Sequence, residues 1–401
     1  MTEPTAISIM GATGSIGTSA LNVIAHANAV ASDGPRFRVV ALVANGDAVT
    51  LAEQALAVRP EIAVVADDAA LPDLRGRLEG SGIAVAGGQE AVIEAALRPC
   101  DKLLAAISGS AGLASTLAAV QAGYTVALAN KESIVCAGAL ILAEAARTGA
   151  TILPVDSEHN AIFQVWQEGR GLEKLTITAS GGPFRTADRA TLAVASPDAA
   201  KAHPNWDMGP KNSIDSATLM NKALEFIEAS YLFGIHERQI DVVVHPQSIV
   251  HGMAHFVDGS VLAQLGVPDM RTPIANALAW PNRVSAPVER LDLAAVGALT
   301  FEPVDSARFP AVDFARHASR SGNAAATLLN SANEAAVAAF LGGKCGFLDI
   351  SWVVGEVLER YADTNFAGMA CDTLEEVMYL DQTGRRLAAD LLKQAPRPTG
   401  G

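Results

Sequence analysis

Seven residues near the start of the chain, Gly11-Ala12-Thr13-Gly14-Ser15-Ile16-Gly17, limit the possible folds more than any other feature. They separate a short apolar run at residues 7–10 from a segment of helical spacing that begins near Thr18. Glycines at this spacing let the backbone amides at a helix N-terminus approach a diphosphate closely. Ordinary strand-to-helix turns also contain glycine, but a position between the first strand and the first helix favours dinucleotide binding.

Strand and helix patterns then alternate along the chain as far as Val155. The apolar runs that we predict to be strands cover residues 37–44, 62–65, 83–86, 102–107, 125–129 and 151–155. Strands that are separated by single helices form a doubly wound parallel sheet. We therefore predict an α/β protein whose residues 1–150 form a Rossmann-like dinucleotide-binding domain.

The pattern changes after Val155. Predicted strands at residues 175–179 and 241–244 are far apart in sequence, and residues 252–265 look like a hairpin around Asp258-Gly259. Three segments of helical spacing come last, at residues 324–341, 350–361 and 373–392. We predict a second, mixed α/β catalytic domain at 151–282, a connecting segment at 283–310 and a C-terminal helix bundle at 311–401.

Charge and cysteine content exclude several classes of partner. The net charge of −14 disfavours nucleic acid and anionic membranes, because either partner requires a large basic surface. The four cysteines are scattered and no secretory leader precedes Ile7, so we expect a cytoplasmic protein without a disulfide framework. The uncharged residues 103–130 are rich in small residues, which suits buried sheet elements better than a membrane span.

Polar residues follow two of the predicted strands in the first half of the chain. Asn130-Lys131-Glu132 comes directly after the strand at 125–129, at the sheet edge where such folds bind ligands, although a charged helix start looks the same. Asp156-Ser157-Glu158 follows the strand at 151–155. If this segment is extended, its alternating geometry places both carboxylates on one side, an arrangement that suits a hard cation.

A third carboxylate comes from the predicted helix at residues 215–225. Thr218, Asn221, Lys222 and Glu225 recur at helical spacing and share one face of that helix. Such a stripe is often merely solvated, but other unusual polar segments occur in the same domain. Ser180-Gly181-Gly182 suits close approach to a phosphate, and residues 203–209, which contain His203 and Trp206, resemble a mobile lid.

The residues at the end of the second predicted strand are Asn45-Gly46-Asp47. At this position a dinucleotide fold contacts the adenosine ribose, and Asp47 resembles the carboxylate of NAD-binding proteins. A solvent-facing turn is the alternative interpretation. Arg and Lys are absent from the segment, so it offers no partner for a 2′-phosphate.

Seven motifs, taken together and in this order, resemble the 1-deoxy-D-xylulose 5-phosphate reductoisomerase family. They are Gly-Ala-Thr-Gly-Ser-Ile-Gly, Ala-Asn-Lys-Glu, Val-Asp-Ser-Glu, Ala-Ser-Gly-Gly-Pro-Phe, His-Pro-Asn-Trp-x-Met-Gly, Asp-Ser-Ala-Thr-x-Met-Asn-Lys-x-Leu-Glu and His-Pro-Gln-Ser. The match extends from Ile7 through Asn333-Glu334 to the terminal helices.

The resemblance implies a role for each matched residue. The residues that it places against NADPH are Thr13, Gly14, Ser15, Ile16, Gly46, Asn130, Glu132 and Gly209. Those that it places on a divalent cation, Mg²⁺, Mn²⁺ or Co²⁺, are Asp156, Glu158 and Glu225. Those that it places on the sugar phosphate substrate are Lys131, Ser157, Glu158, Ser180, His203, Ser216, Asn221, Lys222 and Glu225, with Lys131, Glu158 and His203 as the catalytic residues.

The resemblance also implies a reaction and an assembly. The family isomerises and reduces 1-deoxy-D-xylulose 5-phosphate to 2-C-methyl-D-erythritol 4-phosphate in isoprenoid precursor synthesis, and the expected assembly is a homodimer. Family members often have glycine followed by a basic residue where this chain has Gly46-Asp47. That departure leaves the preference for NADPH over NADH open.

Two other classes of protein compete with this interpretation. A semialdehyde or acyl-phosphate dehydrogenase shares the glycine turn but needs an activated cysteine, and the candidate, Cys136, lies in an apolar helical run. A non-catalytic dinucleotide sensor would keep the first domain but would have no use for three carboxylates.

Overall fold

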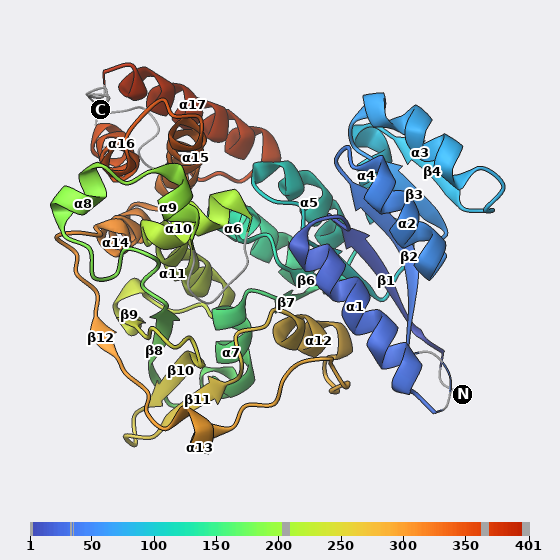
Figure 1. Cartoon of the computed structure of the whole chain (residues 1–401), viewed down its shortest axis with the longest axis horizontal. Coiled ribbons are helices and arrows are strands. Elements are labelled where there is room, and N and C mark those ends of the chain that lie inside the picture. The colour runs from blue at the N-terminus through green and yellow to red at the C-terminus, as the bar shows by residue number, and fades with distance from the viewer. Residues whose placement is uncertain (1–2, 33, 35, 203–208, 362–368, 395–401) are drawn as a thin grey trace. The chain divides into compact units, whose positions relative to one another are not determined.

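The computed structural model describes residues 3–32, 34, 36–202, 209–361 and 369–394. The chain divides into two compact units (Figure 1). The first unit comprises residues 1–133, 141–160 and 269–289, and the second comprises residues 134–140, 161–268 and 290–401. The predicted domain boundaries remain a prediction, and residues 269–289 belong to the first unit although they follow most of the second in sequence.

The first unit is built on a seven-stranded sheet in the order β4-β3-β2-β1-β5-β6-β7, and every strand pair is parallel. Its centre is apolar, and Ile7, Ile9, Leu103 and Leu104 are fully buried. Because strands buried on both faces read as continuous apolar runs, the sequence predicts this sheet well. The strands are β1 Thr5–Met10, β2 Phe37–Ala44, β3 Ile62–Val65, β4 Ala84–Gly87, β5 Lys102–Ala105, β6 Thr125–Leu128 and β7 Thr151–Pro154.

Single helices connect these strands, as a doubly wound sheet requires. They are α1 Ser15–Val30, α2 Ala48–Val58, α3 Leu71–Leu78, α4 Gln89–Ala96, α5 Leu113–Gln121 and α6 Lys131–Thr148, with short 3-10 turns at Asp68–Ala70 and Ser110–Gly112. A later helix, α12 Arg271–Ala279, packs against α1. The buried ammonium of Lys102 donates to three carbonyls at the end of α12, those of Ala277, Leu278 and Trp280, at 2.7–3.1 Å.

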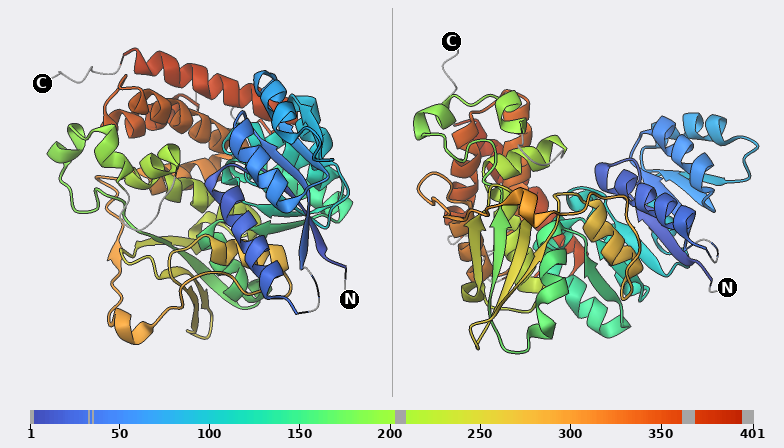
Figure 2. Two further views of the ribbon diagram at one scale, coloured as in Figure 1. Left: turned by 45° about the vertical axis from the view of Figure 1, so that its right-hand side comes forward. Right: turned by 60° about the horizontal axis from the view of Figure 1, so that its bottom comes forward.

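The second unit contains a five-stranded mixed sheet in the order β11-β10-β8-β9-β12, whose strands run side by side in Figure 2. Only β8 and β9 are parallel, because β10 and β11 form the predicted hairpin and β12 pairs antiparallel with β9. The strands are β8 Leu172–Ala179, β9 Ile240–Val244, β10 Val250–Phe256, β11 Val261–Leu265 and β12 Glu302–Pro303. The predicted connecting segment therefore supplies the edge strand β12.

Helices account for most of the rest of the second unit. Four helices lie between β8 and β9 in the sequence: α8 Arg189–Ala193, α9 Pro197–Lys201, α10 Pro210–Ala217 and α11 Met220–Leu232. Short 3-10 turns occur at Gln167–Gly169 and Glu237–Gln239. The later helices are α13 Leu293–Val296, α14 Ala311–Ser321, α15 Asn323–Leu341, α16 Phe347–Tyr361 and α17 Leu374–Leu392. The apolar helix α15 packs against α14, α16 and α17, which confirms the predicted helix bundle. Among the helices described, none is both long and apolar enough to span a membrane.

Two local predictions are wrong. The residues after β7 are not extended, because α7 spans Ser157–Val165 and Glu158 lies in its first turn. The polar segment at 215–225 is not one helix, because α10 ends at Ala217 and Leu219 takes a left-handed conformation with φ +61° before α11 begins. Thr218 therefore lies in the break, where its hydroxyl donates to the carbonyl of Ile214 at 3.0 Å.

Candidate active site

The glycine turn forms a tight connection from β1 to α1. Gly11 has φ +94°, and a Cβ at this position would lie 2.4 Å from the carbonyl oxygen of Ala106. A Cβ at Gly17 would lie 2.3 Å from the carbonyl oxygen of Gly11. No side chain among the described residues caps the start of α1, which follows Gly14 directly. The helix therefore presents its amide end at the carboxyl edge of the sheet, where a diphosphate fits.

Asp47, at the end of the second strand, has a structural role in this chain. Its carboxylate caps α2 by accepting from the Thr50 amide at 3.0 Å, and this hydrogen bond lowers the pKa of Asp47. Gly46 lies beside it, where an added Cβ would meet only the Asp67 side chain at ordinary contact distance. The capping geometry supports the turn interpretation of this segment, because the carboxylate already has an N-cap partner.

Asn130 holds together the loops that border the glycine turn. It caps α6 by accepting from the Ser133 amide at 3.1 Å, and its own amide donates to the carbonyls of Ile107 and Gly109. Helix α6 begins at Lys131, and Ala137 within it has non-helical dihedral angles. The buried Glu132 lies in its first turn.

Lys131 and Asp156 form an ion pair in which each side chain is only 11% exposed. Asp156 also lies 3.1 Å from Nδ1 of His159, a fully buried residue that the sequence interpretation missed. His159 follows Asp156 by three residues at the start of α7, and this spacing is the sequence signal that would have revealed the contact. Ser157 donates to the carboxylate of Glu158. The first unit thus brings two carboxylates, a lysine and a histidine to the end of β7.

Helix α11 of the second unit buries a carboxylate among polar partners. Glu225 is fully buried, the ammonium of Lys222 donates to one of its oxygens, and the amide of Asn221 donates to the other. Lys222 is itself buried. Ionised groups in such an environment are stable only when paired, so this stripe is not the solvated surface that charged helix faces usually are.

The Ser180 loop packs on the end of α10. Gly181 and Gly182 both have positive φ, and a Cβ on Gly182 would lie 2.7 Å from the carbonyl oxygen of Ser216. The Ser180 hydroxyl accepts from the Gly182 amide at 3.2 Å. Ser216 itself is buried.

The remaining predicted site residues differ in what the structure shows of them. His203 and Trp206 lie outside the described residues, and Gly209 is the N-cap of α10. His245, which opens the His-Pro-Gln-Ser motif, is not among the predicted site residues and is structural. Its Nδ1 lies 2.8 Å from the carbonyl oxygen of Thr300, and its Nε2 accepts from the amide of Ile249 at 3.2 Å. Cys136 is fully buried beside Asn330, which makes it unsuitable as a nucleophile.

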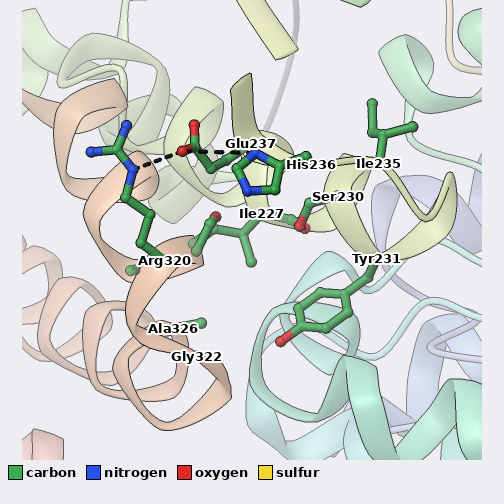
Figure 3. Close-up of a pocket in the computed structure, with 11 residues that line it drawn as sticks. Ile227, Ser230, Tyr231, Ile235, His236, Glu237, Arg320, Gly322 and Ala326 are labelled. Atoms are coloured by element: carbon green, nitrogen blue, oxygen red, sulfur yellow. Dashed lines mark hydrogen bonds and ion pairs between the residues drawn. The ribbon is translucent and has the colours of Figure 1, made fainter. Parts of the chain in front are cut away.

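A separate cavity of about 360 Å³ lies in the second unit among α11, α14 and α15 (Figure 3). Glu237 is one of its lining residues and accepts from Nε of Arg320 at 2.7 Å. The cavity is lined by Ile227, Ser230, Tyr231, Ile235, His236, Glu237, Ala318, Ser319, Arg320, Gly322 and Ala326. None of the predicted site residues is among them.

Comparison with known protein families identifies the group to which these motifs belong. A model of 1-deoxy-D-xylulose 5-phosphate reductoisomerase matches residues 7–138, a model of the C-terminal domain of that enzyme matches residues 152–233, and one described as DXP reductoisomerase C-terminal domain matches residues 265–387. The chain belongs to the 1-deoxy-D-xylulose 5-phosphate reductoisomerase family.

Individual relatives match over nearly the whole chain. The 1-deoxy-D-xylulose 5-phosphate reductoisomerase of Rhodospirillum centenum is 53% identical over 388 residues, which are 96% of this chain and 94% of the relative. A solved structure of the Zymomonas mobilis enzyme in complex with NADPH is 45% identical, with a TM-score of 0.89, and the match covers 98% of this chain and 100% of that one. A solved DOX-P reductoisomerase with NADPH, fosmidomycin and magnesium is 41% identical, with a TM-score of 0.90, over 98% of this chain and 100% of that one. The predicted family and fold are confirmed.

Proposed function

We propose that this chain isomerises and reduces 1-deoxy-D-xylulose 5-phosphate to 2-C-methyl-D-erythritol 4-phosphate, with NADPH and a divalent cation as cofactors. The observation that carries the proposal is the α11 cluster, where Lys222 and Asn221 surround the buried carboxylate of Glu225. This cluster lies in a chain that matches relatives of that name over nearly its full length. A dinucleotide sensor would have no use for such a cluster.

The residues present fit both cofactors. The glycine turn is a tight backbone connection that has no room for a Cβ at Gly11 or Gly17, and it leads directly into the uncapped start of α1, the kind of helix end that binds a diphosphate. Thr13, Gly14, Ser15 and Ile16 would hold the diphosphate of NADPH, and the other residues that we assign to the cofactor are Gly46, Asn130, Glu132 and Gly209. The carboxylates of Asp156, Glu158 and Glu225 form the oxygen donor set that Mg²⁺, Mn²⁺ or Co²⁺ accepts, and we assign the cation to them.

The chemistry divides between cofactors and side chains. When bound, the cation supplies Lewis-acid polarisation of the substrate oxygens, and NADPH supplies the hydride. Ser180, Ser216, Asn221 and Lys222 bind the substrate phosphate, and this remote binding energy orients the reacting carbons. We also assign His203 to the substrate, as the family resemblance implies.

The hydroxyl and keto end of the substrate is bound by Lys131, Ser157 and Glu158. Lys131 already stabilises the negative charge of Asp156, and the same ammonium can stabilise charge that develops on a substrate oxygen or move a proton to it. The hydrogen bond from Ser157 orients the Glu158 carboxylate. Burial of the Lys131 and Asp156 side chains excludes water and strengthens these electrostatic effects.

One assay tests the activity. The absorbance of NADPH is followed with purified protein and 1-deoxy-D-xylulose 5-phosphate, with and without Mg²⁺, and then with NADH in place of NADPH. We expect oxidation that depends on substrate and metal and is faster with NADPH. Absence of oxidation under every condition would refute the activity, whereas equal use of both cofactors would refute only the selectivity.

We further propose a cytoplasmic homodimer. The family resemblance supports the dimer, and the cysteines described, Cys100, Cys136, Cys345 and Cys371, are all free thiols, which suits a reducing compartment. Light scattering coupled to gel filtration should give twice the chain mass of 41.4 kDa, and a monomer mass would refute the dimer.

A further inference from the structure

The carboxylate of Asp215 is buried directly beside a predicted phosphate-binding residue. Asp215 is fully buried in the last turn of α10 and precedes Ser216 in the chain. Its Oδ1 accepts from Nδ2 of Asn333 on α15 at 2.7 Å, and its Oδ2 lies 2.9 Å from Nζ of Lys211, one turn earlier on α10. The carboxylate therefore links the end of α10 both to its own helix and to α15.

Asn333 and Lys211 stabilise the buried Asp215 carboxylate. Asn333 is fully buried, and its Nδ2 donates to Asp215, while its Oδ1 has no hydrogen-bond partner within the described ranges. A buried carboxylate without partners is strongly unfavourable, and Lys211 with Asn333 supplies the charge and the hydrogen bond that stabilise it. The neighbouring Glu334 binds Arg385 of α17, which fixes this part of α15.

The end of α10 needs such an anchor because the chain changes direction there. Leu219 takes φ +61°, and its amide donates to the carbonyl of Ser216 at 3.2 Å. The Ser180 loop packs on the same carbonyl through Gly182. A rotation of the last turn of α10 would therefore move the Ser216 hydroxyl relative to both Ser180 and the start of α11.

We propose that Asp215 is a positioning residue for substrate binding, which holds the Ser216 hydroxyl in place for the substrate phosphate through its contacts with Asn333 and Lys211. The proposal rests on the proposed function, in which Ser216 binds that phosphate. Asp215 itself touches no reacting atom. It acts through the backbone of α10.

A double-mutant cycle on the full-length enzyme tests the proposal. The variants Asp215→Asn, Ser216→Ala and the double variant are compared by kcat/KM for 1-deoxy-D-xylulose 5-phosphate at saturating NADPH and Mg²⁺. Asp215→Asn removes the charge opposite Lys211 and places one amide against another. We expect each single variant to lower kcat/KM about tenfold and the double variant to be no worse than Ser216→Ala alone, because both changes remove the same contact.

A matched control separates positioning from general loss of stability. Glu237 is another buried carboxylate of the second unit, paired with Arg320, and no described contact joins it to α10. Glu237→Gln should leave kcat/KM within twofold of wild type, both alone and combined with Ser216→Ala. If Asp215→Asn does not fold by circular dichroism, the same cycle with Asn333→Ala supplies the test, since this variant retains the Asp215 to Lys211 pair.

The outcomes distinguish the two proposals. Absence of turnover by the wild-type enzyme would overturn the proposed function and this inference with it. Turnover by wild type together with an unimpaired Ser216→Ala would leave the activity in place and overturn the inference. Losses from Asp215→Asn and Ser216→Ala that multiply in the double variant would show that Asp215 acts elsewhere, and would also overturn it.

Discussion

The glycine turn of the first unit and the α11 cluster of the second are built on opposite physical principles. The turn can form only where side chains are missing. A Cβ at Gly11 or Gly17 would collide with backbone oxygens. The cluster depends on charged side chains, because Glu225 and Lys222 are paired in the interior. Backbone geometry fixes the first region, and electrostatic balance fixes the second. A substitution in one region should therefore impair a different property of the protein from a substitution in the other.

The largest effect is expected in the charged region. Glu225→Gln keeps the size of the side chain but removes the charge that balances Lys222 and the carboxylate proposed to bind the cation. We expect kcat/KM to fall by a factor on the order of 1,000, because a lost metal ligand removes charge stabilisation worth several kcal/mol. Steady-state kinetics across a range of Mg²⁺ concentrations measure the effect. An activity near that of wild type at saturating Mg²⁺ would remove Glu225 from the metal site.

The glycine region should respond in binding rather than in chemistry. Gly17→Ala places a methyl group 2.3 Å from the Gly11 carbonyl oxygen, so the turn must shift. We expect the Kd for NADPH to rise about 100-fold, which corresponds to about 2.7 kcal/mol. Titration of cofactor fluorescence measures the Kd.

Gly76→Ala on α3 is the matched control for this substitution, because its added methyl group meets no atom within 4 Å. It should leave the Kd unchanged. An equal loss of affinity in the two variants would show that the glycine turn has no special role.

The two regions also differ in how far the sequence predicts them. The turn, its strand and its helix follow from glycine spacing and an apolar run, because local geometry determines them. The strands of the first unit are predictable in the same way, because their apolar runs are local features of the sequence. After β7 the local pattern gives a wrong prediction. It predicts that residues 156–158 are extended with alternating side chains, but α7 begins at Ser157.

In the second unit the composition of the site was predictable but its contacts were not. Helical spacing correctly grouped Asn221, Lys222 and Glu225, yet placed Thr218 on the same helix, because periodicity does not reveal the left-handed residue Leu219. The contact of Asp215 with Asn333 joins residues 118 positions apart, and no local pattern predicts such a contact. Tertiary packing decides which polar residues meet.

The ion pair of Glu237 and Arg320 lies away from the predicted site, and its contribution to stability should depend on pH. The hydrogen bond from Arg320 holds the pKa of Glu237 below its usual range. A carboxyl group with a lowered folded-state pKa contributes stability above its unfolded pKa, and that contribution is lost as pH falls. The difference in free energy of unfolding between wild type and Glu237→Gln should thus stay nearly constant from pH 7 to about 5 and shrink as the pH falls below about 4.3, the reference pKa of glutamate.

Urea unfolding at several pH values measures this difference. The control is Glu237→Gln measured in an Arg320→Met background. Because Arg320 no longer lowers the pKa of Glu237 there, the difference that Glu237→Gln makes should depend less on pH. A difference that grows on acidification would contradict the assigned direction.

The smallest effect is expected at Asp47, where the two principles meet: a charged side chain borders the glycine-based cofactor site but has a backbone partner of its own. Asp47→Ala removes the cap on α2 and should lower the free energy of unfolding by about 1 kcal/mol. Asp47→Asn keeps a capping oxygen and should be nearly neutral. Because the cap already engages the carboxylate, we expect the ratio of kcat/KM for NADPH to that for NADH to stay within twofold of wild type in both variants. A larger shift in Asp47→Ala would instead assign Asp47 to recognition of the adenosine ribose, and the difference between the two variants would measure how much of that recognition depends on its charge.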